Sequence, residues 1–198
     1  MSGLRPTYGR VSRAGAMALS WSNDHVGPMA RTAEDCALML GAIAGADPLD
    51  ATASARPVDD YLGALAQPVR GLRVGVPENF FFEGLDAEME AAVRAAVATM
   101  ASLGARVEEV RVPDPRVVSD VTQIISRSEA AALHAGLLRE RPDEVGAFTR
   151  ARLELGLRVP AYDYLQALRL RARIARAFSR AVWSRVDVLA APAVPGPA

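Results

Sequence analysis

The chain has 198 residues, of which 51% are apolar and 23% are charged, and its formal net charge is zero. This composition is typical of a globular protein with one sizeable core, and it excludes a global basic field for nucleic acid and an acidic tail. No apolar run approaches the ~20 residues of a membrane span, residues 1–30 hold no continuous apolar signal core, and the single cysteine, Cys36, excludes an internal disulfide. We therefore expect a cytoplasmic protein with no nucleic-acid or membrane partner.

The first third of the chain predicts loops, short strands and two helices. Glycine and proline punctuate Gly3–Gly27 too often for a long element. A helix should begin after Thr32, which together with Asp35 fits a capping box, and Gly45 is a natural stop. The expected apolar face of this helix is Ala33, Cys36, Ala37, Leu40, Ile43 and Ala44. A second, short helix is expected near Asp59–Ala66.

The middle of the chain predicts a strand–helix–strand unit. Leu72–Val76 has the pattern of a buried strand, and Arg106–Val112 has the pattern of a second one. Between them Asp86 can cap a helix that Gly104 closes. The expected apolar stripe of this helix is Met89, Val93, Ala96, Val97, Met100 and Leu103. Because both joints are short, the unit should be a right-handed parallel crossover in an α/β sheet.

The last part of the chain is mostly helical in pattern. We expect helices near Arg116–Arg139, Asp143–Leu155 and Tyr162–Arg185, and then a final buried strand at Val186–Ala191 that prolines cut off. The expected apolar face of the last helix is Leu165, Leu168, Ala172, Ala175, Phe178 and Val182. No internal repeat stands out, and we expect one incomplete domain over residues 1–198.

The basic residues constrain the chemistry. All 23 of them are arginine, and the chain contains neither a Ser-Ser nor a Gly-Gly pair. Arginine-favouring codon usage accounts for most of the missing lysine. Whatever the cause, the chain offers no side-chain amine that could accept a proton, because arginine stays protonated in proteins.

Four stretches of the sequence carry a resemblance to a known family. They are PTYGRVS at Pro6–Ser12, DHVGPMARTAED at Asp24–Asp35, AIAGADPLD at Ala42–Asp50 and DVLAAPAVPGPA at Asp187–Ala198. Together they closely resemble the amidase signature family of serine hydrolases, in which the first three follow the catalytic serine. The resemblance runs through nearly the whole chain. It implies an α/β fold in which a mixed sheet lies between helical layers, here incomplete at both ends.

The resemblance also implies a mechanism. Family members use a serine nucleophile, a second serine in a cis peptide and a neutral lysine, and an acyl-enzyme forms on the way to the acid. These groups belong to lysine and serine-glycine segments that precede the quoted text. This chain contains neither segment, so we expect none of its residues to be catalytic and the chain alone to be inactive. The partner implied is a small-molecule amide, no cofactor is implied, and the oligomeric state is left open, a homodimer included.

Candidate site residues are few. Asp24 and His25 lie in the Asp-His-Val-Gly-Pro block, and the resemblance implies that they help to shape the substrate pocket. The other interpretation, which we favour, is a turn in which the Asp side chain binds backbone N–H groups. The serines at 12, 20 and 22 fit no nucleophile elbow, and they are better interpreted as loop hydroxyls.

The other reactive side chains favour structural roles. Cys36 lies on an apolar helix face, where a buried small hydrophobe is expected. His134 has Glu129 and Glu140 at spacings unsuited to metal ligands, so no metal site is predicted. The segment Phe80–Phe82 could line an apolar substrate channel or could pin the loop after a strand. The arginines of the last long helix predict a solvated or ion-paired face, because no aromatic residues are interleaved with them.

Two alternatives stay open for the function. One is the A subunit of a tRNA-dependent glutamine amidotransferase, but that subunit usually carries Tyr-Asp-Gly-Val-Arg-Tyr-Gly where Ala130–Leu138 reads AAALHAGLL. The departure favours a stand-alone amidase. The other alternative is a non-catalytic pseudoenzyme or partner-binding module. In every case the strands would lack neighbours from segments not present here, so the isolated chain should be marginally stable and prone to aggregate.

Overall fold

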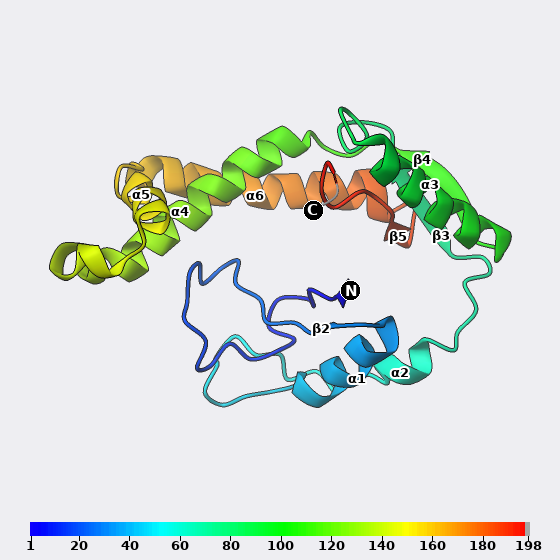
Figure 1. The fold of residues 1–198 in the computed structure, drawn as a ribbon, viewed down its shortest axis with the longest axis horizontal. Helices are drawn as coiled ribbons and strands as arrows, with labels where there is room; N and C mark the ends of the chain where they lie inside the picture. The colour runs from blue at the N-terminus through cyan, green and yellow to red at the C-terminus, as the bar shows by residue number, and fades with distance from the viewer. Residues whose placement is uncertain (197–198) are drawn as a thin grey trace. The chain divides into compact units, whose positions relative to one another are not determined.

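The chain divides into two compact units in the computed structural model, which describes residues 1–196 (Figure 1). The first unit comprises residues 1–67 and 125–159, and the second comprises residues 68–124 and those from 160 onward. A division into compact units does not test the number of domains, so a single partial domain over 1–198 stays a prediction. Pro197, one of the prolines expected to end the chain's last strand, lies outside the described residues.

The first unit begins with a small antiparallel sheet and a capped helix. Strand β1 (Ser2–Gly3) pairs with β2 (Met29–Ala30). Helix α1 (Ala33–Ile43) follows, and the Thr32 hydroxyl accepts a hydrogen bond of 3.0 Å from the Asp35 N–H. The predicted start of this helix is therefore confirmed. Its buried face is narrower than predicted, since only Cys36, Ala37 and Leu40 are buried.

Three further helices, one of them only in part, and a 3₁₀ turn complete the first unit. Helix α2 (Tyr61–Ala64) is short, as predicted, and its N-terminus is capped by the Asp60 carboxylate. Helix α4 (Pro115–Glu140) contributes its later turns, and α5 (Ala147–Leu157) packs on them after a 3₁₀ turn, η1 (Pro142–Glu144). The prediction that α5 begins at Asp143 was wrong, because residues 142–144 form the separate 3₁₀ turn and α5 starts only after Gly146.

The second unit holds the predicted parallel crossover. Strand β3 (Arg73–Pro77) leads to helix α3 (Ala87–Ser102), which Asp86 caps, and then to β4 (Arg106–Val110), parallel to β3. Strand β5 (Val188–Leu189) pairs in parallel with the other side of β3, so the strand order is β4-β3-β5. The prediction of a longer final strand was wrong, because the Val186 N–H still bonds to the Val182 carbonyl of the preceding helical turn.

The side chains of β3 and β4 alternate between the two faces of this sheet, and helical segments cover each face. Val110 lies on one face, where it joins Val112, Val182 and Val186 in a core cluster. A Cβ on Gly75 would meet Val110 and Val186 at 3.0 Å, which shows how closely the layers approach there. On the other face α3 borders Val76 and Val107. The predicted α/β class is confirmed; among the described residues the parallel and antiparallel pairs belong to separate sheets.

The last helix begins where it was predicted and differs from its predicted form at its C-terminal end. Helix α6 (Ala161–Phe178) continues into a π-helical turn, η2 (Ser179–Trp183), in which the Ser184 N–H bonds to the Ser179 carbonyl at 3.2 Å. The predicted apolar face is only partly right. Ala167 is the buried residue of α6, and Leu165 is 57% exposed.

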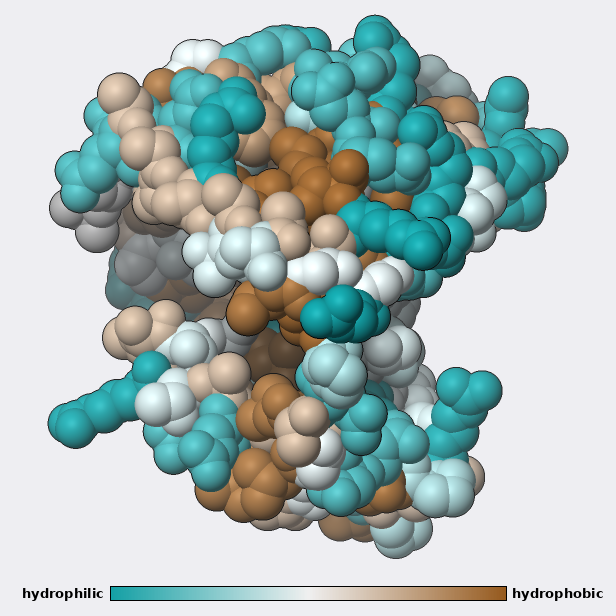
Figure 2. Space-filling view, turned by 90° about the vertical axis from the view of Figure 1, so that its right-hand side faces the viewer, coloured by the Kyte–Doolittle hydropathy of each residue, from teal (hydrophilic) through white to brown (hydrophobic). Residues whose placement is uncertain are grey.

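The structure exposes more surface than a compact chain of its mass. Its accessible area is 13,014 Å². A single domain of 21.0 kDa should expose about 9,000 Å², and two separate domains of half that mass about 11,000 Å². Apolar side chains account for part of the excess, among them Met17, Phe148 and Tyr162, and Figure 2 shows apolar residues open on the viewed face. This surface supports the prediction of marginal stability for the isolated chain. No helix within residues 1–196 combines the length and apolarity needed to cross a membrane.

Candidate functional site

A hollow of about 360 Å³ lies in the first unit, beside the loop that joins residues 13 to 26. Both predicted substrate-binding residues, Asp24 and His25, are in its wall. The remaining lining residues are Arg13, Ala14, Ala16, Met17, Ala18, Trp21, Val26, Leu49 and Asp50. The hollow therefore brings together two of the sequence stretches that carry the resemblance, at residues 24–35 and 42–50.

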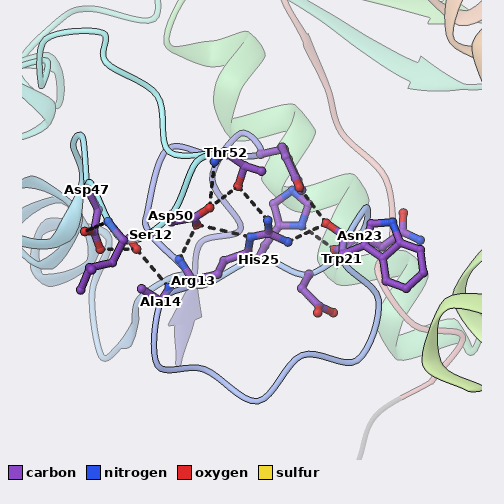
Figure 3. A network of polar contacts seen from close by, with 12 residues as sticks. Ser12, Arg13, Ala14, Trp21, Asn23, His25, Asp47, Asp50 and Thr52 are labelled. Atoms are coloured by element: carbon purple, nitrogen blue, oxygen red, sulfur yellow. Dashed lines mark hydrogen bonds and ion pairs between the residues drawn. The ribbon is translucent and has the colours of Figure 1, made fainter. Parts of the chain in front are cut away.

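Arg13 holds these loops together (Figure 3). Its guanidinium donates to the Trp21 carbonyl at 2.6 Å and to the Thr52 hydroxyl at 2.7 Å. Its Nε lies 3.6 Å from the Asp50 carboxylate, and its planar group stacks over the Tyr8 ring at 4.7 Å. A guanidinium presents several donors in a fixed plane, so one side chain can join three loop segments in this way.

Asp50 is the acidic counterpart of Arg13 in this network. Its carboxylate accepts hydrogen bonds from the Thr52 hydroxyl at 2.6 Å, from the Arg13 N–H at 2.8 Å and from the Thr52 N–H at 2.9 Å. These donors, the hydroxyl first, lower the pKa of Asp50 from 3.8 to about 2. The side chain is only 9% exposed. Asp50 thus stays charged and fixes the wall of the hollow.

The Asp24 carboxylate forms its hydrogen bonds within its own loop. One oxygen accepts from the N–H groups of Leu19 at 2.8 Å and of Ser20 at 2.9 Å, and the Ser20 carbonyl accepts in return from the Asp24 N–H at 2.8 Å. This is the arrangement expected of a turn-forming aspartate. A direct contact between Asp24 and a substrate stays a prediction.

His25 is oriented by two neighbours. Its Nδ1 lies 2.6 Å from the Asn23 carbonyl oxygen and 2.9 Å from Nη2 of Arg5, and that nitrogen lies 3.0 Å from the same carbonyl. A carbonyl oxygen only accepts and a guanidinium only donates, so Nδ1 donates to Asn23 when it carries the ring proton and accepts from Arg5 when it does not. The other ring nitrogen, Nε2, has no hydrogen-bond partner within residues 1–196. The Tyr8 ring meets the imidazole edge-on at 5.6 Å.

Glu129 of helix α4 binds the loop that contains Ser20 and Ser22. Its carboxylate accepts from the Ser20 hydroxyl at 2.6 Å, from the Ser22 hydroxyl at 2.8 Å and from the Ser22 N–H at 3.1 Å. Glu129 is only 1% exposed and Ser20 only 2%. Buried carboxylates are tolerated where several donors satisfy them, so this contact ties the segment before Asp24 to α4.

Comparison with known proteins decides the family. The Amidase family profile matches residues 1–198. The chain belongs to the amidase family.

Similar proteins cover almost the whole chain. An amidase of Pseudomonas putida is 48% identical over 194 residues, which is 98% of this chain and 41% of that protein. The A subunit of the glutamyl-tRNA(Gln) amidotransferase of Pseudomonas aeruginosa strain LESB58 is 39% identical over 222 residues, which is 100% of this chain and 46% of that protein. The chain therefore spans less than half the length of these curated relatives.

A solved structure gives the same result for the fold. It is described as an unexpected vestigial protein complex that reveals the evolutionary origins of an s-triazine catabolic enzyme. It matches with a TM-score of 0.88 and 34% identity, and the match covers 98% of this chain and 41% of that one. The amidase fold predicted from the resemblance is confirmed.

The three serines considered as nucleophiles all donate to carboxylates. Ser12 donates to Asp47 at 2.6 Å, while the hydroxyls at 20 and 22 donate to Glu129. Within residues 1–196 neither histidine bonds to a serine, since His134 meets the Ala18 carbonyl instead. These contacts agree with the interpretation of the serines as loop hydroxyls.

The remaining candidates take structural positions in this part of the amidase fold. Cys36 is buried, and its thiol points toward the Ser2 carbonyl at 3.5 Å. Within residues 1–196 no group of three or more His, Cys, Asp or Glu side chains could hold a metal ion. Arg185, which the sequence assigned to the last long helix, lies in the turn after η2 and reaches Glu108 at 3.4 Å.

The sequence did not point to Arg13, Asp50 or Glu129 as site residues. Arg13 and Asp50 stand at the borders of two quoted stretches, so a search for charged residues flanking those stretches would have found them. Glu129 lies 109 residues from Ser20 in the sequence. No local pattern links the two, because the contact is created by the path of the chain.

The pKa of Asp50 leads to a prediction about acid stability. A carboxylate whose pKa is lowered on folding stabilises the fold fully above its unfolded value near 3.8, and this contribution disappears as the pH falls toward about 2. Replacing Asp50 with Asn should therefore lower the thermal midpoint at pH 6 and cost little at pH 2. The thermal midpoints of both proteins between pH 2 and pH 6 test this. Asp143→Asn, at a side chain that is 99% exposed, is the control and should leave the profile unchanged. If the thermal midpoint of the wild type exceeds that of Asp50→Asn by the same amount at pH 2 and at pH 6, the prediction is contradicted.

Proposed function

We propose that this chain forms a pocket-bearing part of an amidohydrolase that cleaves the C–N bond of a small carboxylic amide through an acyl-enzyme. The proposal rests chiefly on the P. putida amidase, to which 98% of the chain aligns at 48% identity. The hollow around Asp24 and His25 adds a place for the substrate. We include a cytoplasmic location in the proposal, because the one cysteine of the chain is buried and has no second cysteine with which to form an internal disulfide.

Within this proposal the chain binds and orients the substrate. We propose the tautomer in which Nδ1 carries the proton and donates it to the Asn23 carbonyl, so that Nε2 of His25 accepts a hydrogen bond from the N–H of a carboxamide in the hollow. Arg13 and Asp50 keep the wall rigid, so the entropy of ordering it is not lost when the substrate binds. Preorganisation of this kind needs no reacting group in the chain itself.

The neutral lysine that the family mechanism uses as a base has no counterpart in the chain. No lysine is present, and the arginines stay protonated. The Glu129 carboxylate is 1% exposed, holds two serines and does not line the hollow. We therefore propose that the 198-residue polypeptide is inactive alone and that nucleophile and base belong to another part of the amidase domain.

One observation makes an amidotransferase function a weaker candidate than a stand-alone amidase. The alignment with the P. putida amidase has 194 positions and covers 98% of the chain, so it runs almost without gaps. The alignment with the P. aeruginosa amidotransferase needs 222 positions for 198 residues. That relative therefore has segments that this chain lacks, which is a second difference beside the absent Tyr-Asp-Gly-Val-Arg-Tyr-Gly block. We propose a stand-alone amidase on these grounds.

A chimera tests the function. This chain replaces the aligned 41% of the P. putida amidase, and ammonia release is measured with an aliphatic amide, an aryl amide and glutamine. The intact P. putida amidase and the 198-residue chain alone are the controls. We expect the folded chimera to release ammonia from simple amides, and the chain alone to release none above the blank.

Other outcomes contradict parts of this proposal. Activity on glutamine alone would favour the glutamine amidotransferase. A chimera that folds with native-like circular dichroism but hydrolyses no amide would favour a non-catalytic module. Ammonia release by the chain alone would show that a base in this sequence was overlooked.

A further inference from the structure

The exposed face of α6 carries a line of arginines that the proposed function does not use. They follow one another at spacings of four, three and four residues, and the last of them lies in η2. The line consists of Arg169, Arg173, Arg176 and Arg180, and all four are exposed. Residues three and four apart lie on one side of a helix, so the line is about 16 Å long. We call it the arginine row.

The arginine row lies opposite the side of α6 that packs within the second unit. Phe178 packs against the core cluster of the sheet, and Ile174 lies on the same side of the helix, four residues earlier. At about 100° of rotation per residue, both are on the side opposite Arg169 and Arg176. Arg171 is also on the packed side and does not belong to the row. The side chains of the row therefore point away from their own unit.

The arginine row has no acidic partner within residues 1–196. None of its side chains forms an ion pair or a hydrogen bond there, whereas in α3 Arg94 pairs with Glu90 one turn earlier at 2.7 Å. The one acidic residue of α6, Asp163, lies six residues before Arg169, a spacing that puts it on another side of the helix. Like charges three and four residues apart repel one another and weaken a helix. Bound anionic groups would remove this repulsion.

Two exposed apolar side chains extend the same line toward the start of α6. Leu165 precedes Arg169 by four residues and Tyr162 precedes Leu165 by three, so the helical spacing continues. Tyr162 is 68% exposed and Leu165 is 57% exposed. Tyrosine and arginine are both enriched in protein interfaces. One face of α6 thus offers an apolar contact at its start and then four positive charges in line.

We propose that this face of α6 binds an acidic amphipathic helix of a separate protein. Carboxylates three and four residues apart form a matching line on such a helix, and each guanidinium can hold a carboxylate through two N–H donors. An apolar side chain of the partner helix then meets Tyr162 and Leu165. Interfaces within a domain are largely apolar, whereas interfaces between separate proteins are more polar and rich in arginine. The row therefore favours a separate protein over the remainder of the amidase domain.

Nucleic acid and membranes fit this face less well. A single-strand site interleaves basic and aromatic residues, but the one aromatic residue between Arg169 and Arg180 is Phe178, on the packed side. A helix that lies on a membrane buries its apolar face in lipid, and the apolar face of α6 already packs on the sheet core. The chain carries no net charge, so it has no broad positive field to attract a polyanion. The proposal does not depend on amide hydrolysis.

Fluorescence anisotropy of labelled helical peptides tests the proposal. Two peptides share one composition of alanine, glutamate and leucine. In the first the glutamates repeat at spacings of four, three and four, with the leucines in line at one end, and in the second they are spread around the helix. We expect the first peptide to bind saturably and the second about fivefold more weakly, because fewer of its carboxylates reach the row. The folded P. putida chimera should bind the first peptide as the chain alone does.

Substitutions in the chain locate the site. Arg173→Gln and Arg176→Gln should each weaken binding of the first peptide about two- to fivefold, the effect of one exposed ion pair. Tyr162→Ala should weaken it by at least about the same factor, because the aromatic contact is lost. Arg139→Gln, at an exposed arginine of α4, is the matched control and should leave binding unchanged. Circular dichroism checks that every variant keeps its helix content.

Other outcomes overturn the proposal. The first is no binding of the in-line peptide, or equal binding of the two peptides. Unchanged binding in both arginine variants would place the site elsewhere. A chimera that fails to bind the peptide, while the chain alone binds it, would show that the rest of the amidase domain covers the row. Displacement of the peptide by a short DNA duplex or by phosphatidylserine vesicles, as readily as by unlabelled peptide, would favour a nucleic acid or a membrane instead.

Discussion

Replacing Glu129 with Ala should lower the free energy of unfolding of the first unit by about 3 kcal/mol. The substitution leaves the Ser20 hydroxyl and two donors of Ser22 without their acceptor, and the first of these is buried. Removing the acceptor of a buried donor costs about 1–3 kcal/mol, and loss of a buried charged partner lies at the upper end of that range. Urea unfolding in a Trp183→Phe background measures this, because Trp21 then reports on the first unit alone.

Two variants control for the loss of a glutamate from α4. Glu140→Ala removes the same side chain from an exposed position of the same helix, and it should change the free energy of unfolding by less than about 0.5 kcal/mol. Glu129→Gln keeps one acceptor oxygen and should lose roughly half as much as Glu129→Ala. Equal effects of Glu129→Ala and Glu140→Ala would show that the contact to Ser20 and Ser22 does not stabilise the loop.

Replacing Gly156 with Ala should destabilise the first unit by about 2–3 kcal/mol. Gly156 is buried in α5, and a Cβ there would overlap the Arg127 carbonyl oxygen of α4 and lie 2.8 Å from the Ala131 Cβ. Backbone atoms in a packed helix pair cannot move aside cheaply, so the two helices must separate. The same urea experiment measures the change.

Gly136→Ala is the matched control for this substitution. Gly136 lies within α4, and a Cβ there would meet no atom within 4 Å. The added methyl group should therefore stabilise the protein by up to about 1 kcal/mol, the difference in helix propensity between the two residues. If Gly156→Ala changes the free energy of unfolding in the same direction and by the same amount as Gly136→Ala, the close approach of α4 and α5 is contradicted.

Local sequence patterns predicted the regular elements well where the cause is local. Thr32 and Asp86 start their helices because each side chain accepts from a nearby N–H group. The parallel crossover of β3, α3 and β4 followed from two short apolar runs and short joints. Spacing and capping act within a few residues, so the sequence alone is enough to identify them.

Elements that depend on tertiary contacts were predicted less well. The last strand was predicted too long because Val186, although buried, belongs to the end of the η2 turn. No local sequence pattern predicts the π turn. The turn places Val182 in the core cluster with Val110 and Val186, and these contacts form only in the folded chain. The same holds for Phe80, whose left-handed backbone depends on Glu83 and Arg116.

The candidate site was predicted only in part. The resemblance pointed to Asp24 and His25, and both line the hollow. The side chains that shape the site come from segments far apart in the sequence, as in the contacts of Arg13 with Thr52 and of Glu129 with Ser20. The contacts of the His25 ring with Asn23 and Arg5 likewise become visible only in the folded chain.

The proposed division of roles, with the pocket in this chain and the reacting groups outside it, is tested most directly by a trapped acyl adduct. A serine-reactive fluorophosphonate is added to the active chimera, and the modified residue is located by peptide mass spectrometry. We predict a single modified serine within the part that comes from the P. putida amidase, and no adduct in the 198 residues of this chain. An adduct on any side chain between Met1 and Ala198 would contradict that division.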